Sequence, residues 1–257
     1  SIKAPSSIAE ISISGANAMK LKNKDDEIIV VDNSSSDGSV QEVRERFPEI
    51  QLICSDINLG VCGGRNLGFR ASVNEVVVYL DDDARLLPST LNKVREHFSK
   101  DNNIGVLTFS IVHMPDKKIE NPLSGIEVAH YHGAGHAFSK KALEDIGYLD
   151  DSMRFGAQEI ESSFRLKMAG YKILFDDTLK VEHWSFVPKG HDRSHRLINS
   201  CRSWAYVYAK YFPVHYAALF TFRRFVRFIS YCLKNNVSKV IILKGLLKAS
   251  VIFCRTI

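Results

Sequence analysis

Short apolar runs alternate with helical patterns along the first part of the chain. Residues 76–80 are five consecutive apolar residues, mostly β-branched or aromatic, and they predict a strand that is buried on both faces. Residues 27–31 and 51–54 predict two further strands, and residues 40–47 predict a short helix that ends at Pro48. Strands that alternate with helices predict an α/β fold, with a mainly parallel sheet flanked by helices.

The last quarter of the chain has the periodicity of long helices. Residues 196–211 predict one helix, which Pro213 ends. Residues 215–233 and 237–253 predict two amphipathic helices, each with apolar residues on one face and Lys or Arg on another. Two arrangements suit this pattern: the helices lie in a membrane interface, or they pack on the rest of the protein with their basic residues outward.

The distribution of charge sets the same segment apart. The net charge is +5, yet residues 193–257 hold 12 Lys and Arg and no acid, whereas the preceding 192 residues hold 22 Lys and Arg against 29 Asp and Glu. A wholly basic tail favours contact with an anionic surface, either a membrane or a nucleic acid.

The cysteines and the apolar segments bear on the compartment. The five cysteines are scattered, which favours a reducing compartment and argues against a disulfide framework or a zinc site. The sequence shows neither the pattern of a signal peptide nor an uncharged apolar run long enough to span a bilayer. We therefore expect a cytoplasmic protein, with peripheral contact at the cytoplasmic face of the membrane as an extension of that expectation.

Three carboxylates, Asp81, Asp82 and Asp83, directly follow the predicted strand at 76–80. Ligands of open α/β folds bind at the carboxyl edge of the sheet, where these acids are expected to lie. Because strand side chains alternate, Asp81 and Asp83 should point the same way and Asp82 the other. Adjacent carboxylates repel each other unless a cation lies among them, and Mg²⁺ and Mn²⁺ prefer carboxylate oxygen. The alternative is a solvated acidic turn.

Two other segments have side chains suited to a bound nucleotide. Residues 32–39 follow the strand at 27–31 and form a turn rich in Asp, Asn and Ser, whose short polar side chains can bind a ligand. Residues 58–68 form a glycine-rich loop that runs into a helix, whose start can take an anion, with Arg65 as an added cation.

In chain order, these segments resemble the inverting glycosyltransferase family 2. The resemblance covers about residues 1–210 and is specific because several motifs occur in family order. It implies a GT-A, Rossmann-like fold with a nucleotide-binding half at 1–100 and an acceptor-binding half at 101–192, followed by a basic helical extension at 193–257. The segments that continue it are residues 132–135, 146–150, 158–161 with Arg165, 170–173 and 181–183.

The resemblance implies roles for individual residues. Asp32 matches the acid that contacts the nucleobase, and Asp81 the acid near the ribose. Asp83 matches the metal-binding acid, with Asp81 and His183 as further metal ligands. The implied cation is Mn²⁺ or Mg²⁺, and the implied donor is a UDP-sugar, with dTDP- and GDP-sugars as alternatives. The residues implied to contact the nucleotide are Pro5, Ser6, Asp32, Asn33, Ser34, Arg65, Asn66, Asp81 and Asp82.

The implied catalytic base lies at residues 158–161. The family usually has Glu-Asp where this chain has Gln158-Glu159, so the match makes Glu159 the base and leaves Glu161 as the rival. Both glutamates also suit the solvated first turn of a helix, where the helix dipole favours acids.

The sequence thus predicts a metal-dependent inverting glycosyltransferase that moves a sugar from a nucleotide-diphospho-sugar to an acceptor hydroxyl. A glycan or lipid-linked acceptor and a role in glycan or cell-surface polysaccharide synthesis are expected, and nucleic acid is not expected as a partner. Two alternatives stay open: a catalytically inactive module that binds sugar nucleotides or membrane, which the Gln158-Glu159 departure permits, and a nucleotidyltransferase.

Overall fold

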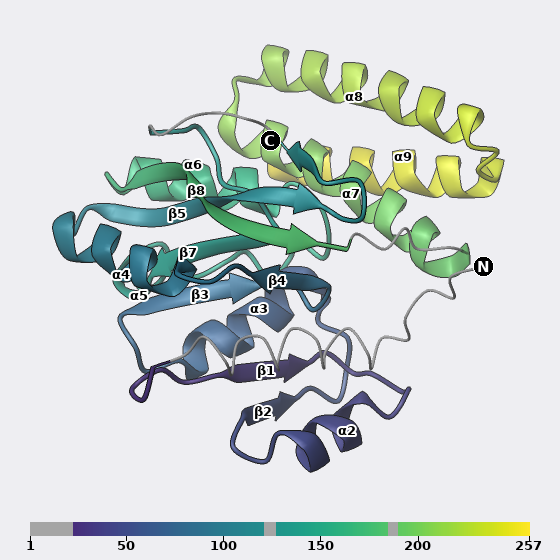
Figure 1. The fold of residues 1–257 in the computed structure, drawn as a ribbon. Coiled ribbons are helices and arrows are strands. Elements are labelled where there is room, and N and C mark those ends of the chain that lie inside the picture. Colours follow the sequence, from purple (N-terminus) through teal and green to yellow (C-terminus); the bar gives the residue numbers. More distant parts are fainter. Residues whose placement is uncertain (1–22, 121–126, 185–189) are drawn as a thin grey trace. The chain divides into compact units, whose positions relative to one another are not determined.

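The computed structural model describes residues 23–120, 127–184 and 190–257 (Figure 1). Pro5 and Ser6 lie outside the described residues. The chain forms two compact units, which we call the first unit (residues 1–59, 63–149 and 162–186) and the second unit (60–62, 150–161 and 187–257). The predicted boundary between residues 192 and 193 stays a prediction.

The first unit contains the strands and most of the shorter helices. The strands are β1 (Ile29–Asp32), β2 (Gln51–Cys54), β3 (Val76–Leu80), β4 (Ala84–Leu86), β5 (Ile104–His113), β6 (Lys118–Glu120), β7 (Gly135–Ser139) and β8 (Lys172–His183). The helices are α2 (Ser39–Arg46), α3 (Gly60–Ala71), α4 (Thr90–Lys100), α5 (Lys140–Asp145) and α6 (Gln158–Met168). The first residues of α3 and of α6 belong to the second unit.

The described strands form two sheets. β1 and β2 pair in parallel, and the larger sheet has the order β3-β7-β5-β8-β4, with β6 paired to β5. β7 is antiparallel to both β3 and β5, and β8 is parallel to β5. Strands β3, β5 and β8 therefore run in one direction, and their carboxyl ends meet at one edge of the sheet.

The α/β class is confirmed, but the strand directions are more mixed than predicted. Among the described strands, only β1–β2 and β5–β8 pair in parallel, because β7, β6 and β4 each pair antiparallel to their neighbours. β3 is also half-buried rather than fully buried, since β7 is its one partner among the described strands. A run of apolar residues could not distinguish these two cases.

The core of the larger sheet lies between its strands and α4. Val94 of α4 is buried among side chains of β4, β5, β7 and β8, with Leu91 and Phe98 beside it. Gly135 of β7 fills a tight position, since a Cβ atom there would lie 2.7 Å from Val181 Cγ2 and 3.3 Å from Phe109 Cδ2. The backbone of β7 can thus approach these side chains only because residue 135 is a glycine.

The predicted glycine-rich loop is mostly helix, because α3 already begins at Gly60. Two of its glycines, one helical turn apart, face β1. A Cβ atom on Gly64 would lie 3.1 Å from Asn33 Nδ2, and one on Gly68 would lie 3.2 Å from Val31 Cγ2. These glycines therefore let the helix pack closely on the strand, which is a use of glycine that the sequence alone did not distinguish from a loop.

Three helices make up most of the second unit: α7 (Gly190–Tyr211), α8 (Val214–Lys234) and α9 (Lys239–Thr256). They share a small core of Cys201, Ala205, Phe228, Cys232, Ile242 and Ala249. Gly245 allows α9 to approach α8, since a Cβ atom there would lie 2.7 Å from Phe228 Cζ. No helix of the described residues has both the length and the apolar character needed to cross a bilayer.

Replacement of Gly135 tests the packing of β7. We expect Gly135→Ala to lower the free energy of unfolding by about 1–3 kcal/mol, because the new methyl group must displace Val181 or Phe109 in a packed core. Urea denaturation measures this. Gly170→Asn is the control, since Gly170 has a positive φ that Asn tolerates and an added Cβ meets no atom within 4 Å. Equal stability of Gly135→Ala and the parent would contradict the proposed packing.

Candidate functional site

The pairing of β4 with β8 brings the acidic segment to a histidine. The acids at 81–83 connect β3 to β4, and Ala84, the first residue of β4, lies opposite His183, the last residue of β8. The Trp184 amide donates a hydrogen bond of 2.8 Å to the carbonyl oxygen of Asp83. Asp83 and His183 are therefore held side by side by backbone contacts at the carboxyl edge of the sheet.

Asp81, Asp83 and His183 form a group suited to a divalent cation. His183 Nε2 lies 2.9 Å from Asp83 Oδ1 and 3.8 Å from Asp81 Oδ2, and one ligand atom of each residue lies within 4.8 Å of the others. Two carboxylates and an imidazole match the donors that Mn²⁺ and Mg²⁺ accept, with the carboxylate oxygens as their preferred ligands. The residues present therefore fit the implied metal.

The third carboxylate shows how much negative charge is gathered here. Burial, together with the carboxylates of Asp83 and Asp81, raises the pKa of Asp82. Asp81 and Asp83, rather than Asp82, converge on His183, as the expected alternation of side chains implies.

Asp81 is held by two residues on its other side. The Tyr79 hydroxyl donates to Asp81 Oδ1, and Arg65 Nη2 lies 3.5 Å from the same oxygen. The Arg65 guanidinium lies 4.0 Å from the centre of the Tyr79 ring, and its Nη2 is 3.4 Å from the Gly133 carbonyl oxygen. Burial raises the pKa of Tyr79 well above its usual range, so the hydroxyl remains a donor. One oxygen of Asp81 is therefore fixed by the protein, while the other faces His183.

Tyr79 was missed in the sequence analysis. It precedes Asp81 by two residues, so both side chains are expected on the same side of the strand. That spacing was an available signal, but an aromatic residue in a buried strand more often belongs to the core.

The turn after β1 is ordered by its own side chains. The Asp32 carboxylate accepts the Ser35 amide at 3.3 and 3.2 Å, and Asn33 Oδ1 accepts the Leu59 amide at 2.8 Å. Ser34 has a positive φ, and its hydroxyl donates to the Asp56 carbonyl oxygen at 3.4 Å. Figure 1 shows β1 and β8 pointing to the same side of the first unit. The contact of these residues with a nucleotide stays a prediction.

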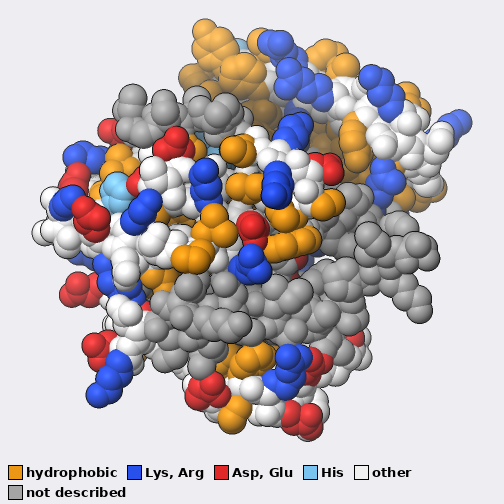
Figure 2. Space-filling model, in the orientation of Figure 1, with side chains coloured by type: hydrophobic (Ala, Val, Ile, Leu, Met, Phe, Trp, Pro, Cys, Tyr) orange, Lys and Arg blue, Asp and Glu red, His pale blue; other side chains and the backbone are white. Residues whose placement is uncertain are grey.

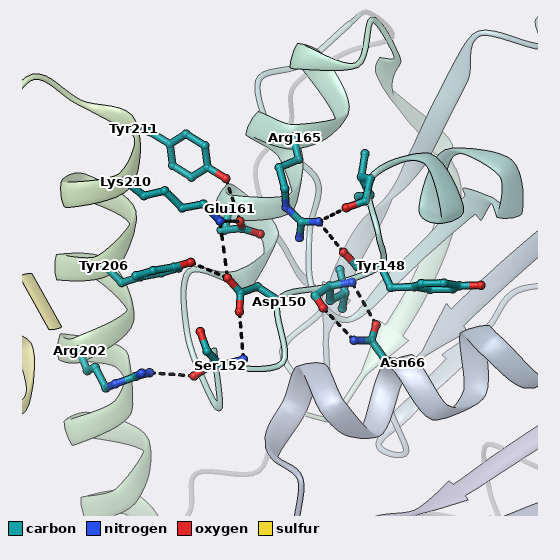
Figure 3. Close-up of polar contacts among 12 residues, drawn as sticks. Asn66, Tyr148, Asp150, Ser152, Glu161, Arg165, Arg202, Tyr206, Lys210 and Tyr211 are labelled. Atoms are coloured by element: carbon teal, nitrogen blue, oxygen red, sulfur yellow. Dashed lines mark hydrogen bonds and ion pairs between the residues drawn. The ribbon is translucent and has the colours of Figure 1, made fainter. Parts of the chain in front are cut away.

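Asn66 is occupied by the backbone of Leu149. Its Nδ2 donates to the Leu149 carbonyl oxygen at 2.8 Å, and its Oδ1 accepts the Leu149 amide at 3.0 Å (Figure 3). Arg165 donates to the carbonyl oxygens of Ile146 and Tyr148, the latter at 2.6 Å. Asn66 and Arg165 therefore fix the segment just before residue 150, and a contact of Asn66 with the nucleotide stays a prediction.

The two glutamates of α6 lie in different surroundings. The side chain of Glu161 is 1% exposed, and its Oε1 accepts hydrogen bonds of 2.8 Å from both Lys210 Nζ and the Tyr211 hydroxyl (Figure 3). Glu159 is half-buried, and one of its oxygens accepts a hydrogen bond of 2.8 Å from Gln158 Nε2. Glu161 is thus a buried carboxylate paired with α7, whereas Glu159 keeps part of its surface in solvent.

The charges of this cluster are matched. Burial and the hydrogen bond to Glu161 raise the pKa of Tyr211 to about 12. Burial opposes the positive charge of Lys210, but hydrogen bonds to Glu161 and Tyr206 outweigh it and raise the pKa of that ammonium group. Lys210 therefore stays charged and Tyr211 stays protonated while they hold Glu161.

The loop before α6 is joined to α7 by further contacts. Asp150 accepts the Tyr206 hydroxyl at 2.6 Å and the Ser152 amide at 3.0 Å, and Arg202 donates to the Ser152 carbonyl oxygen at 2.8 Å (Figure 3). Together with Lys210, these residues connect three successive turns of α7 to residues 150–161. This segment and α7 therefore form one structural block within the second unit.

The sequence matches one family model. Residues 10–125 match the model described as glycosyl transferase family 2. A relative in the curated collection of proteins, poly-beta-1,6-N-acetyl-D-glucosamine synthase of Staphylococcus aureus, is 25% identical over 193 residues, which are 68% of this chain and 46% of that protein. The chain spans 46% of the length of this synthase and 32% of the length of another curated relative that it matches.

Solved structures of similar fold include TarS and a mannosyltransferase. S. aureus TarS 1–349 in complex with UDP-GlcNAc is 12% identical with a TM-score of 0.61, over 97% of this chain and 87% of that one. The mannosyltransferase PcManGT from Pyrobaculum calidifontis, in complex with GDP-Man and Mn²⁺, is 19% identical with a TM-score of 0.59, over 96% and 84%. At these identities the likeness establishes the fold, which is GT-A as predicted.

The pairing of Glu161 with Lys210 can be tested by a double-mutant cycle. We expect Lys210→Met to lower the free energy of unfolding by about 1–3 kcal/mol, because it leaves a buried charge short of its partner. Adding Glu161→Gln should recover part of this loss, since the remaining group is neutral. Lys141→Met is the control, because its ion pair with Asp145 is exposed and should change stability by less than about 1 kcal/mol. Urea denaturation of the four chains measures the coupling, and purely additive effects would show that the two residues are not paired.

Proposed function

We propose that the chain, whose residues 10–125 match the glycosyl transferase family 2 model, is a metal-dependent inverting glycosyltransferase of that family. In this proposal it moves a sugar from a nucleotide-diphospho-sugar to an acceptor hydroxyl. The observation that carries the proposal is the convergence of Asp81, Asp83 and His183 at the carboxyl edge of the sheet. The two carboxylates repel each other, and a bound cation would relieve that repulsion.

The donor and the metal are proposed from two kinds of support. The similar structures contain UDP-GlcNAc in one case and GDP-Man with Mn²⁺ in another. We propose a UDP-sugar as donor, with GDP- and dTDP-sugars as alternatives, and Mn²⁺ or Mg²⁺ held by Asp83, Asp81 and His183. When bound, such a cation neutralises charge on the leaving diphosphate. Tyr79 and Arg65 would keep Asp81 oriented for this task, because they hold the oxygen that does not face His183.

Further residues are proposed to bind the nucleotide. Asp32 and Asn33 would contact the base and Arg65 the phosphates, where a guanidinium can bind an anion in a fork. Pro5, Ser6, Ser34 and Asp82 complete the proposed set. Asn66, which is buried and bonded to Leu149 at both ends of its amide, would support the site only by holding that segment.

We propose Glu159 as the general base that takes the proton from the acceptor hydroxyl. A general base must be ionised, and it must be accessible to an acceptor that enters the site from solvent. Glu159 keeps partial exposure, whereas Glu161 is buried against Lys210 and Tyr211. The difference in surroundings supports Glu159 over Glu161.

The setting of the reaction is proposed from the relatives. Similarity to a poly-beta-1,6-N-acetyl-D-glucosamine synthase supports an acceptor that is a glycan or is linked to lipid, and a role in glycan or polysaccharide synthesis. The basic segment at 193–257 supports peripheral contact with an anionic membrane at its cytoplasmic face.

The Gln158-Glu159 departure favours one other candidate, a module that binds sugar nucleotides without turnover. Release of nucleoside diphosphate from a panel of UDP-, GDP- and dTDP-sugars, measured with Mn²⁺ or Mg²⁺, separates the two. Donor binding without release under every condition would support the inactive module, and release of pyrophosphate from a nucleoside triphosphate and a sugar phosphate would indicate a nucleotidyltransferase.

Metal dependence is tested at Asp83. We expect Asp83→Ala to abolish turnover and to weaken binding of the nucleoside diphosphate in Mn²⁺, because the cation would link the protein to the diphosphate. Turnover assays and calorimetric titration, each with and without EDTA, measure both effects. Asp116→Ala removes an exposed carboxylate elsewhere and is the control. Full activity of Asp83→Ala, or of the parent in EDTA, would exclude the proposed metal role.

The identity of the base is tested by a matched pair of variants. Glu159→Gln keeps the shape of the side chain and removes the base, so turnover should fall by about 10²–10⁴-fold. Binding of the nucleoside diphosphate should be retained, because the base acts on the acceptor. Glu161→Gln should keep most of its turnover at temperatures well below unfolding. Near-normal turnover of Glu159→Gln together with loss in Glu161→Gln would falsify the assignment.

A further inference from the structure

Helices α8 and α9 each have a second apolar face that no described residue covers. The inner face of α9 includes Ile242 and Ala249, which are buried in the three-helix core. Its outer face is nevertheless apolar, and Leu243 remains 58% exposed. The exposed apolar residues are Val214, Tyr216, Leu219, Phe222, Val226, Tyr231 and Leu233 of α8 and Val240, Leu243, Leu247 and Val251 of α9.

The exposed apolar residues follow helical spacing. Phe222, Val226 and Leu233 lie at positions i, i+4 and i+11 of α8, which share one side of a helix. On α9, Leu243, Leu247 and Val251 lie at i, i+4 and i+8 and do the same. Exposed apolar residues that are scattered singly are ordinary, but two continuous stripes indicate a surface that binds something.

Each stripe is accompanied by a row of cations. In five places an exposed apolar residue is followed directly by an exposed Lys or Arg. The pairs are Phe222-Arg223, Val226-Arg227, Leu233-Lys234, Leu243-Lys244 and Leu247-Lys248. Figure 2 shows hydrophobic and basic side chains interleaved over α8. Since neighbouring residues differ by about 100° around a helix, each row of cations flanks its apolar stripe.

The chemistry of this surface selects among possible partners. Residues 193–257 contain no acid, so two copies of the surface could not pair their cations with each other. Single-stranded nucleic acid is bound by basic grooves in which bases stack on several aromatic side chains, whereas Phe222 is the one aromatic residue among the six that form the two stripes. A lipid surface with anionic headgroups satisfies both features, because apolar side chains enter the acyl boundary while Lys and Arg reach the headgroups.

We propose that the outer faces of α8 and α9 are a membrane-docking surface for anionic lipid. Their apolar stripes enter the interface, and the flanking cations bind the headgroups. This inference rests on the proposed function only for its purpose, which is to bring the enzyme to a lipid-linked acceptor. It also combines the two arrangements predicted for these helices, because they pack on their own unit and still present apolar residues outward.

Vesicle co-sedimentation of the full chain tests the proposal. Vesicles of phosphatidylcholine alone are compared with vesicles that also contain phosphatidylglycerol, at low and high salt. We expect binding to the anionic vesicles, weakened by salt, and little binding to the neutral ones. Equal binding to both kinds of vesicle, or no binding to either, would overturn the proposal.

Two sets of variants separate the contributions. Replacement of Arg223, Arg227, Lys244 and Lys248 by Gln should weaken binding by about fivefold for each cation removed. Phe222→Ser with Leu247→Ser keeps every charge and should weaken it by at least about tenfold, because the apolar anchors are lost. Val73→Ser and Arg44→Gln, at exposed positions of the first unit, are the controls. No effect of either set would refute the surface as assigned.

The remaining alternatives have their own readouts. Light scattering of the parent and of Phe222→Ser with Leu247→Ser detects self-association, and a dimer that the variant dissolves would assign the stripes to a second copy instead. Release of nucleoside diphosphate without vesicles is measured in parallel. Vesicle binding without turnover would leave the docking surface standing and remove the proposed reaction, and turnover without vesicle binding would do the reverse.

Discussion

Repulsion between the adjacent carboxylates at residues 81–83 is the constraint on which the candidate site of the first unit depends. Asp81, Asp82 and Asp83 are adjacent in the chain, and the sheet turns two of them toward the same histidine. Backbone contacts hold the two residues together. The register of β4 on β8 places His183 beside Asp83, and the Trp184 amide donates a hydrogen bond to the Asp83 carbonyl oxygen. Tyr79 and Arg65 stabilise Asp81 through its Oδ1, the oxygen that does not face His183. Several contacts therefore hold carboxylates close together, and such an arrangement indicates a site for a cation.

The second unit solves a related problem by another means. Glu161 is buried as a charge, and the protein supplies the counter-charge from Lys210 rather than from a ligand. The contrast between the two acidic groups is informative, because Glu161 is paired with Lys210, whereas Asp81 and Asp83 converge with His183 in a geometry suited to a cation. Physical surroundings thus distinguish a structural acid from acids that are suited to binding.

Local sequence patterns predicted much of the fold. The strands at 51–54 and 76–80 match β2 and β3, since period and residue type determine such elements. The alternation of side chains also predicted that Asp81 and Asp83 would converge. Other features depend on contacts between distant residues, which no local pattern contains. The antiparallel insertion of β7 between β3 and β5, the packing of Gly64 and Gly68 on β1, and the pairing of Glu161 with Lys210 are of this kind. For the amphipathic helices, two arrangements suited the sequence pattern, and only the exposure of both stripes showed that each helix is apolar on two sides.

The block formed by α7 and residues 150–161 limits how this fold can be divided. A cut between residues 192 and 193, where the change in charge suggests a boundary, would separate Glu161 and Asp150 from Lys210, Tyr211 and Tyr206. A catalytic half taken without α7 would carry a buried carboxylate stripped of its donors. The basic helix is therefore not an accessory that recombination can exchange freely. Its last turns must be inherited together with the segment that carries Glu159, so the two are expected to evolve as one module.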